Sequence, residues 1–171
     1  MIIAVTEKGR LRMPKILAID PGNTHSGVAI IQMPGFGLEW FAKLQNEDVY
    51  KEAHRYDFDE IAIEMVACYG MPVGKTTFDT CLWIGRFIEQ FKGHKISFVF
   101  RKDEKIYLCE DSRAKDSNIR QALINRYAKH DFKNGKGTKK TPDTFYGVSN
   151  DVWSAIAVGV THYEMSGAAI Q

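Results

Sequence analysis

The sequence predicts an α/β fold in which helices flank a mixed five-stranded sheet. Two observations support this fold class. The first part of the chain has three short apolar runs separated by tight turns, which is typical of an antiparallel meander. The rest of the chain alternates helical and strand-like patterns, and strand–helix–strand connections within one sheet favour parallel pairing.

The meander is predicted from segments 15–20, 26–32 and 36–44. KILAID and SGVAIIQ are apolar runs, and FGLEWFAKL follows them across a Pro-Gly turn. Glycine and proline between such runs are the residues that tight turns prefer. Residues 1–14 precede the first strong strand signal, so we expect an N-terminal extension there, with Met13 as an alternative start position.

The alternating part is predicted from changes in the spacing of apolar residues. EIAIEMV has strand character, whereas TTFDTCLWIGRFIEQFK places apolar residues three and four positions apart, as on one face of a helix. Asn46 and Asp116 are expected to act as helix N-caps. The expected elements are a helix from Asn46 to His54, a strand at 60–66, a helix at 76–92, a strand at 95–100, a helix from about Asp116 and a helix from Asn150 to Tyr163.

Length and composition fit a single domain from residue 15 to residue 171. A chain of 171 residues, 44% hydrophobic and 26% charged, buries enough surface to need no disulfides. Cys68, Cys81 and Cys109 lack metal-ligand spacing and are expected to be reduced and partly buried. Because no apolar stretch reaches the ~18 residues of a membrane span, we expect a cytoplasmic protein with no membrane partner. The net charge of +2 neither requires nor excludes a polyanionic partner.

Three acidic residues occupy positions where a carboxylate is costly. Asp20 ends an apolar strand just before Pro-Gly, Glu64 lies inside the run IAIEMVA, and Asp151 opens an apolar helix. Each acid also has a purely structural explanation. Asp20 would be a turn residue, Glu64 would belong to a buried ion pair, and Asp151 would be an acid at the start of a helix. Together, three carboxylates on two strands and a helix suit a hard cation such as Mg²⁺, or Mn²⁺ as a substitute. Such clusters typically serve two-metal phosphodiester hydrolysis.

Four segments in this chain follow a recognisable order and spacing. They are ILAIDPGNTHSGVAII, IAIEMVACYG, DSRAKDSNIRQALINRY and SNDVWSAIAVGVTHYE, and they span Lys15 to Tyr163. In these segments the chain resembles the RuvC family of Holliday junction resolvases, and most closely its bacteriophage and prophage branch. The resemblance implies a ribonuclease H-like fold and a Mg²⁺-dependent crossover junction endodeoxyribonuclease that resolves branched DNA. It also implies the cytoplasm of a bacterial host as the place of action.

The resemblance assigns roles to individual residues. Asp20 matches the acid on the first strand and Glu64 the acid on the fourth strand. Asp151 matches the first of two acidic or histidine positions on the last helix. The second position falls on Ser154, which shares the helix face and would hold a water on the metal. Asp116 is an alternative carboxylate donor.

The expected DNA-binding surface is basic. The loop FKNGKGTKK alternates lysines with glycines, so we expect a partly mobile segment that orders against phosphates, although a plain solvated loop has the same composition. Tyr69, in the loop after Glu64, would stack on an unpaired base or pack under Met71. His25 lies near Asp20 and would either assist the site or belong to a surface turn. The expected DNA-binding residues are Lys133, Lys136, Lys139, Lys140, Arg113, Lys115 and Tyr69.

A Holliday junction has two-fold symmetry, so the resemblance implies a C2 homodimer. The apolar helix at 76–92, with Trp83, Phe87 and Phe91, is the predicted interface. Two other functions stay open. A DNA-binding protein of the same fold with little or no catalysis is suggested by Ser154. An actin-like nucleotide-binding module is disfavoured, since 171 residues are too few for its two domains.

Overall fold

The computed structural model describes residues 4–5, 11–70 and 72–168. Within these residues the main sheet has five strands in the order β5-β4-β3-β6-β7. β3, β4 and β5 form an antiparallel meander, and β6 pairs in parallel with both β3 and β7. The predicted mixed sheet is therefore confirmed. The strands are β3 (Lys15–Asp20), β4 (His25–Gln32), β5 (Gly37–Gln45), β6 (Glu60–Met65) and β7 (Lys95–Phe100).

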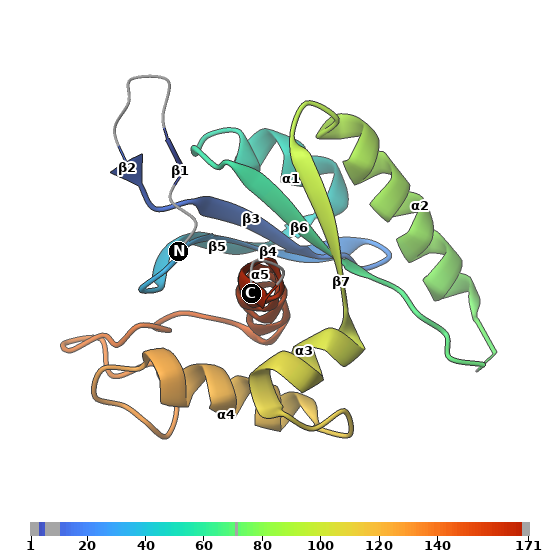
Figure 1. The fold of residues 1–171 in the computed structure, drawn as a ribbon. Helices are drawn as coiled ribbons and strands as arrows, with labels where there is room; N and C mark the ends of the chain where they lie inside the picture. The colour runs from blue at the N-terminus through green and yellow to red at the C-terminus, as the bar shows by residue number, and fades with distance from the viewer. Residues whose placement is uncertain (1–3, 6–10, 71, 169–171) are drawn as a thin grey trace.

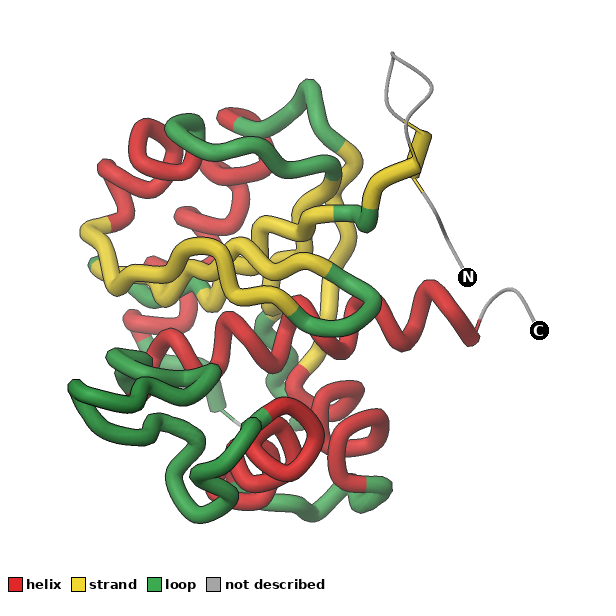
Figure 2. The backbone as a smooth tube through the Cα atoms, turned by 90° about the vertical axis from the view of Figure 1, so that its left-hand side faces the viewer, coloured by secondary structure: helices red, strands yellow, loops and turns green. Residues whose placement is uncertain are grey.

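Helices cover both faces of the sheet (Figure 1). α1 and α2 pack on one face, and α5 crosses the other. α3 and α4 lie beyond α5, so that α5 is enclosed between them and the sheet, as Figure 2 shows from the side. The helices are α1 (Asn46–Ala53), α2 (Lys75–Gln90), α3 (Arg101–Cys109), α4 (Asp116–Tyr127) and α5 (Asn150–Ala168).

Alternation along β3 divides the core into two clusters. Ile16 and Ala18 face α5, whereas Leu17 and Ile19 face α1 and α2, and all four are fully buried. A strand buried on both faces needs a continuous apolar run, which is the pattern of KILAID. Asp20 follows Ala18 by two residues and therefore belongs to the face that α5 covers.

A glycine lets α5 lie close to the sheet. A Cβ on Gly159 would come within 2.7 Å of Cδ1 of Ile31 and 3.0 Å of Cβ of Ala18. Only glycine allows this separation, because real Cβ atoms avoid contacts under about 3.0 Å. The close packing fixes the height of α5 above β3 and β4, and with it the position of the residues at its first turn.

The structure corrects several local predictions. α3 is an additional helix that the sequence pattern did not predict. Asn46 and Asp116 are the first residues of α1 and α4, whereas the N-cap positions belong to Gln45 and Lys115. Cys81 is exposed, while Cys68 and Cys109 are partly buried.

The predicted interface on α2 is also wrong in its residues. Phe87 and Phe91 are fully buried against the sheet, so they belong to the core. The exposed apolar residues of this helix are Phe78, Leu82 and Ile88, at 59%, 65% and 38% exposure. Helical spacing identified an amphipathic helix but did not show which of two apolar stripes faces inward.

The predicted extension at residues 1–14 lies partly outside the described residues. Within it, β1 (Ala4–Val5) and β2 (Leu11–Arg12) pair with each other in an antiparallel fashion. No helix in the described ranges is long and apolar enough to cross a membrane.

Candidate active site

Two carboxyl groups meet at the ends of neighbouring parallel strands. Ile19 pairs with Ile63 in the register of β3 and β6, so the next residues, Asp20 and Glu64, lie side by side. Both point toward the face covered by α5, and their carboxyl groups are hydrogen-bonded to each other. The sequence prediction that these two acids are adjacent is consistent with this register.

Asp151 reaches the same place from the first turn of α5. Asp20 pairs with Gly27 on β4, and Gly27 pairs with Lys43 on β5. The backbone of Asp151 lies on Gly27, where an added Cβ would overlap the Asp151 carbonyl oxygen and come 3.3 Å from its Cβ. The Asp151 carboxylate is bound by Lys43, with Nζ 2.5 Å from Oδ2. The third acid therefore lies beside the other two, held by a lysine.

Burial and mutual repulsion change the protonation of the pair. Burial first, and then the charge of Glu64, raise the pKa of Asp20 to about 8. Burial and the charge of Glu104 raise the pKa of Glu64, while the hydrogen bond from Asp20 opposes that rise. With its pKa near 8, Asp20 keeps its proton at neutral pH. A carboxyl group that holds a proton next to a second carboxyl group marks a position where a cation can replace that proton.

Arg101 and Glu104 belong to this site, although the sequence pattern identified neither. β7 runs directly into α3, which places Arg101 next to the end of β6. Its guanidinium binds the Glu104 carboxylate and donates from Nη2 to Oδ1 of Asp116 at 2.6 Å. Glu104 is fully buried, and its Oε1 has no hydrogen-bond partner within the described residues. Burial raises the pKa of Glu104 to about 8, against the opposing charge of Arg101.

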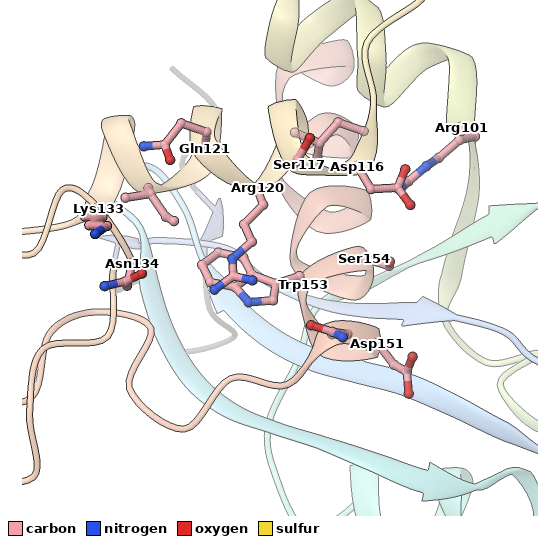
Figure 3. A pocket seen from close by; sticks show the side chains of 13 residues that line it. Arg101, Asp116, Ser117, Arg120, Gln121, Lys133, Asn134, Asp151, Trp153 and Ser154 are labelled. Carbon is pink, nitrogen blue, oxygen red and sulfur yellow. The ribbon is translucent and has the colours of Figure 1, made fainter.

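Three hollows meet at these charged groups. The largest, of about 630 Å³, lies between α4 and the first turn of α5 (Figure 3). A second, of about 190 Å³, follows the turn after β3, and a third, of about 250 Å³, lies between Glu64 and Tyr69. Asp20, Arg101 and Asp151 each line two of the three. The carboxylates thus lie where the three depressions join.

The donor set suits a hard divalent cation, although the side chains are not gathered around one. In the part of the chain that the structure describes, no three His, Cys, Asp or Glu residues surround a common point. Asp20 and Glu64 are in contact, whereas Asp151 is engaged by Lys43. All three groups supply oxygen ligands, which Mg²⁺ and Mn²⁺ prefer. The three residues therefore fit such a cation, provided that the Asp151 carboxylate leaves Lys43 and binds the cation in its place.

The turn after Asp20 is fixed by a side chain from the start of α1. Asn46 is buried, donates from Nδ2 to the Gly22 carbonyl at 2.9 Å and accepts a hydrogen bond from Ser26 at 2.7 Å. Its backbone N–H also donates to the Thr24 carbonyl. Asn46 thus secures the loop beside Asp20, in place of the capping role that its sequence position predicts. His25 lies in this turn and lines the adjoining hollow.

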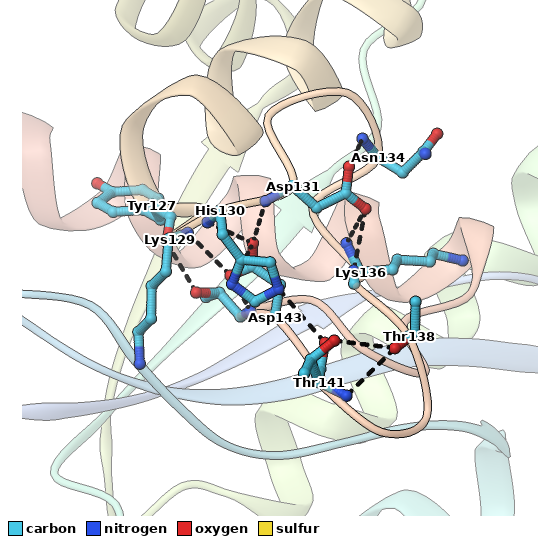
Figure 4. Close-up of polar contacts among 11 residues, drawn as sticks. Tyr127, Lys129, His130, Asp131, Asn134, Lys136, Thr138, Thr141 and Asp143 are labelled. Carbon is cyan, nitrogen blue, oxygen red and sulfur yellow. Dashed lines mark hydrogen bonds and ion pairs between the residues drawn. The ribbon is translucent and has the colours of Figure 1, made fainter.

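The lysine-rich loop is organised by two carboxylates (Figure 4). Asp143 is buried and accepts hydrogen bonds from the backbone N–H groups of Lys129, His130, Asp131 and Thr144. Although burial opposes it, these N–H donors hold the pKa of Asp143 well below its usual range. Asp131 in turn accepts from the backbone of Asn134, Lys136 and Gly137. These hydrogen bonds give the loop one defined conformation in this structure, and its mobility stays a prediction.

The other predicted residues divide into two groups. Tyr69 and Ser154 both line hollows at the site, and Tyr69 is 65% exposed in a left-handed conformation with φ of 42°. Met71, under which Tyr69 was expected to pack as an alternative, lies outside the described residues. Of the lysines, Lys133 lines the largest hollow. Arg113, Lys115, Lys139 and Lys140 are exposed but line none of the three hollows.

Comparison with solved structures identifies the fold. No protein-family model matches the sequence, and no curated protein matches it. T. thermophilus RuvC in complex with a Holliday junction substrate has a TM-score of 0.68 and 17% identity, over 91% of this chain and 97% of that one. The Thermus thermophilus RuvC structure gives 0.65 and 18%, over 90% and 96%. The fowlpox virus resolvase in complex with its substrate Holliday junction DNA gives 0.41 and 14%, over 88% and 99%. The two RuvC matches confirm the predicted ribonuclease H-like α/β fold.

Proposed function

We propose that the protein is a metal-dependent endonuclease that cuts branched DNA, with Holliday junctions as the leading substrate. The observation that carries this proposal is the contact between the partly buried carboxyl groups of Asp20 and Glu64, with Asp151 fixed beside them on Gly27. Two acids in contact at strand ends, with a third from a helix, are suited to holding hard cations at a phosphodiester.

Asp20, Glu64 and Asp151 would hold the cation, with Mg²⁺ as the expected ion and Mn²⁺ as a substitute. When bound, such ions activate a water and stabilise the leaving oxygen in phosphodiester hydrolysis. β3 and β6 fix the first two carboxylates through their register, and Gly27 brings the third against them. Ser154 lines the adjoining hollow and would position a water there. Arg101 keeps a positive charge beside the acids, where it would contact the phosphate.

Branched DNA as the substrate class is supported from two directions. The fold matches that of T. thermophilus RuvC, which was solved with a Holliday junction substrate. The hollows also present Arg101 near the carboxylates and Arg120 and Lys133 further along, and Tyr69 lines the hollow next to Glu64. Cations bind backbone phosphates, and an exposed aromatic ring can stack on a base that a junction leaves unpaired. Such an enzyme would act in DNA recombination in the bacterial cytoplasm, on phage or host DNA.

A homodimer follows from the symmetry of a four-way junction, because paired cuts need paired active sites. The proposed interface is the outer stripe of α2, formed by Phe78 and Leu82, with Ile88 exposed at its flank. On the neighbouring edge strand, Phe98 and Phe100 are 41% and 38% exposed. Exposed apolar side chains gathered on one helix and one strand edge are a typical oligomer contact.

A second function is favoured by two specific observations. Asp151 is neutralised by Lys43, and Ser154 stands where the family resemblance expects a second acidic or histidine residue. Both features would lower the affinity of the site for a second cation. The corresponding function is binding of branched DNA with little or no cleavage.

Cleavage of a labelled substrate panel tests the proposal. Four-way, three-way, flap and linear DNA are incubated with wild-type protein, Asp20→Asn and Glu64→Gln, in Mg²⁺ and in Mn²⁺. We expect the wild type to cut the four-way junction fastest and both variants to be inactive while still binding it. Glu60→Gln is the matched control, since Glu60 lies on the same strand and face but pairs with Lys95 and His162 away from the hollows. A variant that cuts at the wild-type rate contradicts the assignment, and junction binding without cleavage in either metal supports the second function.

A further inference from the structure

The two ends of the largest hollow carry different groups (Figure 3). Asp151 and the ion pair of Asp116 with Arg101 lie at the end next to the active-site carboxylates, and Lys133 and Asn134 lie at the other end. Arg120 lies between these two ends. The volume of about 630 Å³ is within the ~300–1,000 Å³ range of small-ligand sites. An extended anionic ligand that starts at the carboxylates would therefore meet cationic and amide groups further along.

Arg120 is placed to contact such a ligand. Its guanidinium lies over the ring of Trp153, 4.9 Å from the ring centroid, and pairs with no carboxylate among the residues that the structure describes. Stacking on an aromatic ring leaves the in-plane N–H donors of an arginine free for phosphate or base acceptors. The arginine is thus oriented without being neutralised.

Trp153 gives this part of the hollow a fixed wall. Its ring packs on Phe145 with centroids 4.5 Å apart, and the residue is only 5% exposed. The indole N–H is buried and has no hydrogen-bond partner within the described ranges. The fold therefore leaves this donor unsatisfied in the wall of the hollow.

We propose that this hollow binds the nucleotide next to the scissile phosphate on the cleaved strand, with Arg120 as the residue that holds it. The inference rests on the proposed nuclease function and deepens it. The scissile phosphate would lie at Asp151 and the carboxylates beside it. The neighbouring nucleotide would extend toward Arg120, with Lys133 contacting its phosphate and Asn134 and Gln121 contacting its base edge. The hollow would therefore select the bases that flank the cut.

The test combines a protein change with a DNA change. A four-way junction carries one abasic position at a time along each strand near the branch point, and the Kd is measured in Ca²⁺ for wild-type protein and Arg120→Ala. Cleavage rates are then measured in Mg²⁺. The control is Arg86→Ala, because Arg86 also lies over a tryptophan, 4.5 Å from the Trp83 ring centroid, but on α2 at the other face of the sheet. Trp153→Phe keeps an aromatic ring and removes the indole N–H, so it should weaken binding less than Arg120→Ala does.

We expect one abasic position to weaken wild-type binding by about 5- to 100-fold, as for the removal of one stacked or bonded base. Arg120→Ala should bind the intact junction more weakly by a similar factor and be insensitive to that same abasic position, whereas Arg86→Ala should behave as wild type. The inference is overturned if, at every abasic position, the Kd of Arg120→Ala rises by the same factor as the Kd of the wild type. This holds even if cleavage is intact. If the protein does not cleave the junction but Arg120→Ala is still insensitive to one abasic position, the nuclease proposal is removed and the nucleotide site stays in place.

Discussion

The backbone of Asp151 lies directly on Gly27, so close that any side chain on Gly27 would overlap the Asp151 carbonyl oxygen. Gly27 is also the strand partner of Asp20. One residue on β4 therefore sets the distance between an acid at the end of β3 and an acid on α5.

Gly27→Ala should disrupt the site more than it disrupts the fold. The added methyl group must push the first turn of α5 away from β4, which separates Asp151 from Asp20 and Glu64. We expect Mn²⁺ affinity, measured by titration calorimetry, and junction cleavage to fall by at least about 10-fold, the lower end of the effect of disturbing the support of a metal ligand. Gly37→Ala is the control, because a Cβ there meets only the Gln32 side chain at 3.4 Å. Unchanged Mn²⁺ binding in Gly27→Ala would contradict the assignment of Asp151.

The metal-free protein should become less stable as pH rises, because of Asp20. Burial and Glu64 raise the pKa of Asp20 to about 8, so the native state holds this proton more tightly than the unfolded state does. The stabilising effect is complete below the ordinary Asp pKa of about 4 and disappears as pH rises toward about 8. Asp20→Asn should therefore have a higher Tm than wild type near pH 8 and no such advantage near pH 4, with each ~1 kcal/mol corresponding to ~2–4 °C.

The cation reverses this comparison. Mg²⁺ should raise the Tm of the wild type near pH 8 and leave that of Asp20→Asn unchanged, since the cation replaces the proton that Asp20 holds beside Glu64. Calorimetric scans with Mg²⁺ and with chelator measure both effects. Equal Tm values for the two proteins across the whole pH range would show that Asp20 does not carry the raised pKa.

The lysine-rich loop should control affinity and its salt dependence. Lysines that bind phosphates release counterions and carry no base information, so replacing Lys133, Lys136, Lys139 and Lys140 by Ala should weaken junction binding at low salt. The slope of log K against log salt should flatten by up to about 0.9 for each phosphate that a lysine no longer neutralises. At saturating protein the cleavage rate and cut positions should be unchanged.

Exposed lysines elsewhere provide the control for this loop. Lys51 and Lys92 are exposed at α1 and after α2, on the other face of the sheet. Their double replacement by Ala should leave the salt slope unchanged. If the loop variant also keeps the wild-type slope, the loop is solvated surface and the DNA lies elsewhere.

Asp143 should be required for the conformation of this loop. The backbone N–H groups that hold its pKa below the usual range favour the ionised form, so its contribution is complete above the unfolded pKa of about 4 and disappears as pH falls. Asp143→Ala should lower the Tm at neutral pH, by an amount that shrinks in acid. Amide exchange at Lys129, His130 and Asp131 should accelerate in the variant, and retained protection there would contradict the role.

The outer stripe of α2 should hold two copies together. Leu82 is the most exposed residue of the stripe, so Leu82→Glu should convert the expected dimer into a monomer, as measured by light scattering over a range of concentrations. Ile106→Glu places the same charge on an exposed apolar residue of α3, on the other side of the molecule, and should leave the dimer intact. A wild-type protein that is monomeric at all concentrations would remove this interface.

Local sequence patterns were enough to predict the five strands of the main sheet, four of the helices and the places of the three acids along the chain. These follow from local patterns: alternation and turn residues define KILAID and its partners, and a carboxylate inside an apolar run is unusual wherever the chain goes. The order of strands and helices also limited the topology to a mixed sheet.

The groups that surround those acids, and the protonation of the acids, depend on how the chain packs in three dimensions. Arg101 and Glu104 lie far from Glu64 along the chain, and the partnership of Lys43 with Asp151 depends on strand register and on the close approach of α5 to Gly27. Likewise, Phe87 and Leu82 are both large apolar residues, and only packing separates the buried stripe of α2 from the exposed one. Local pattern fixes the element to which a side chain belongs, whereas its charge state and contacts depend on neighbours that folding brings from distant parts of the chain.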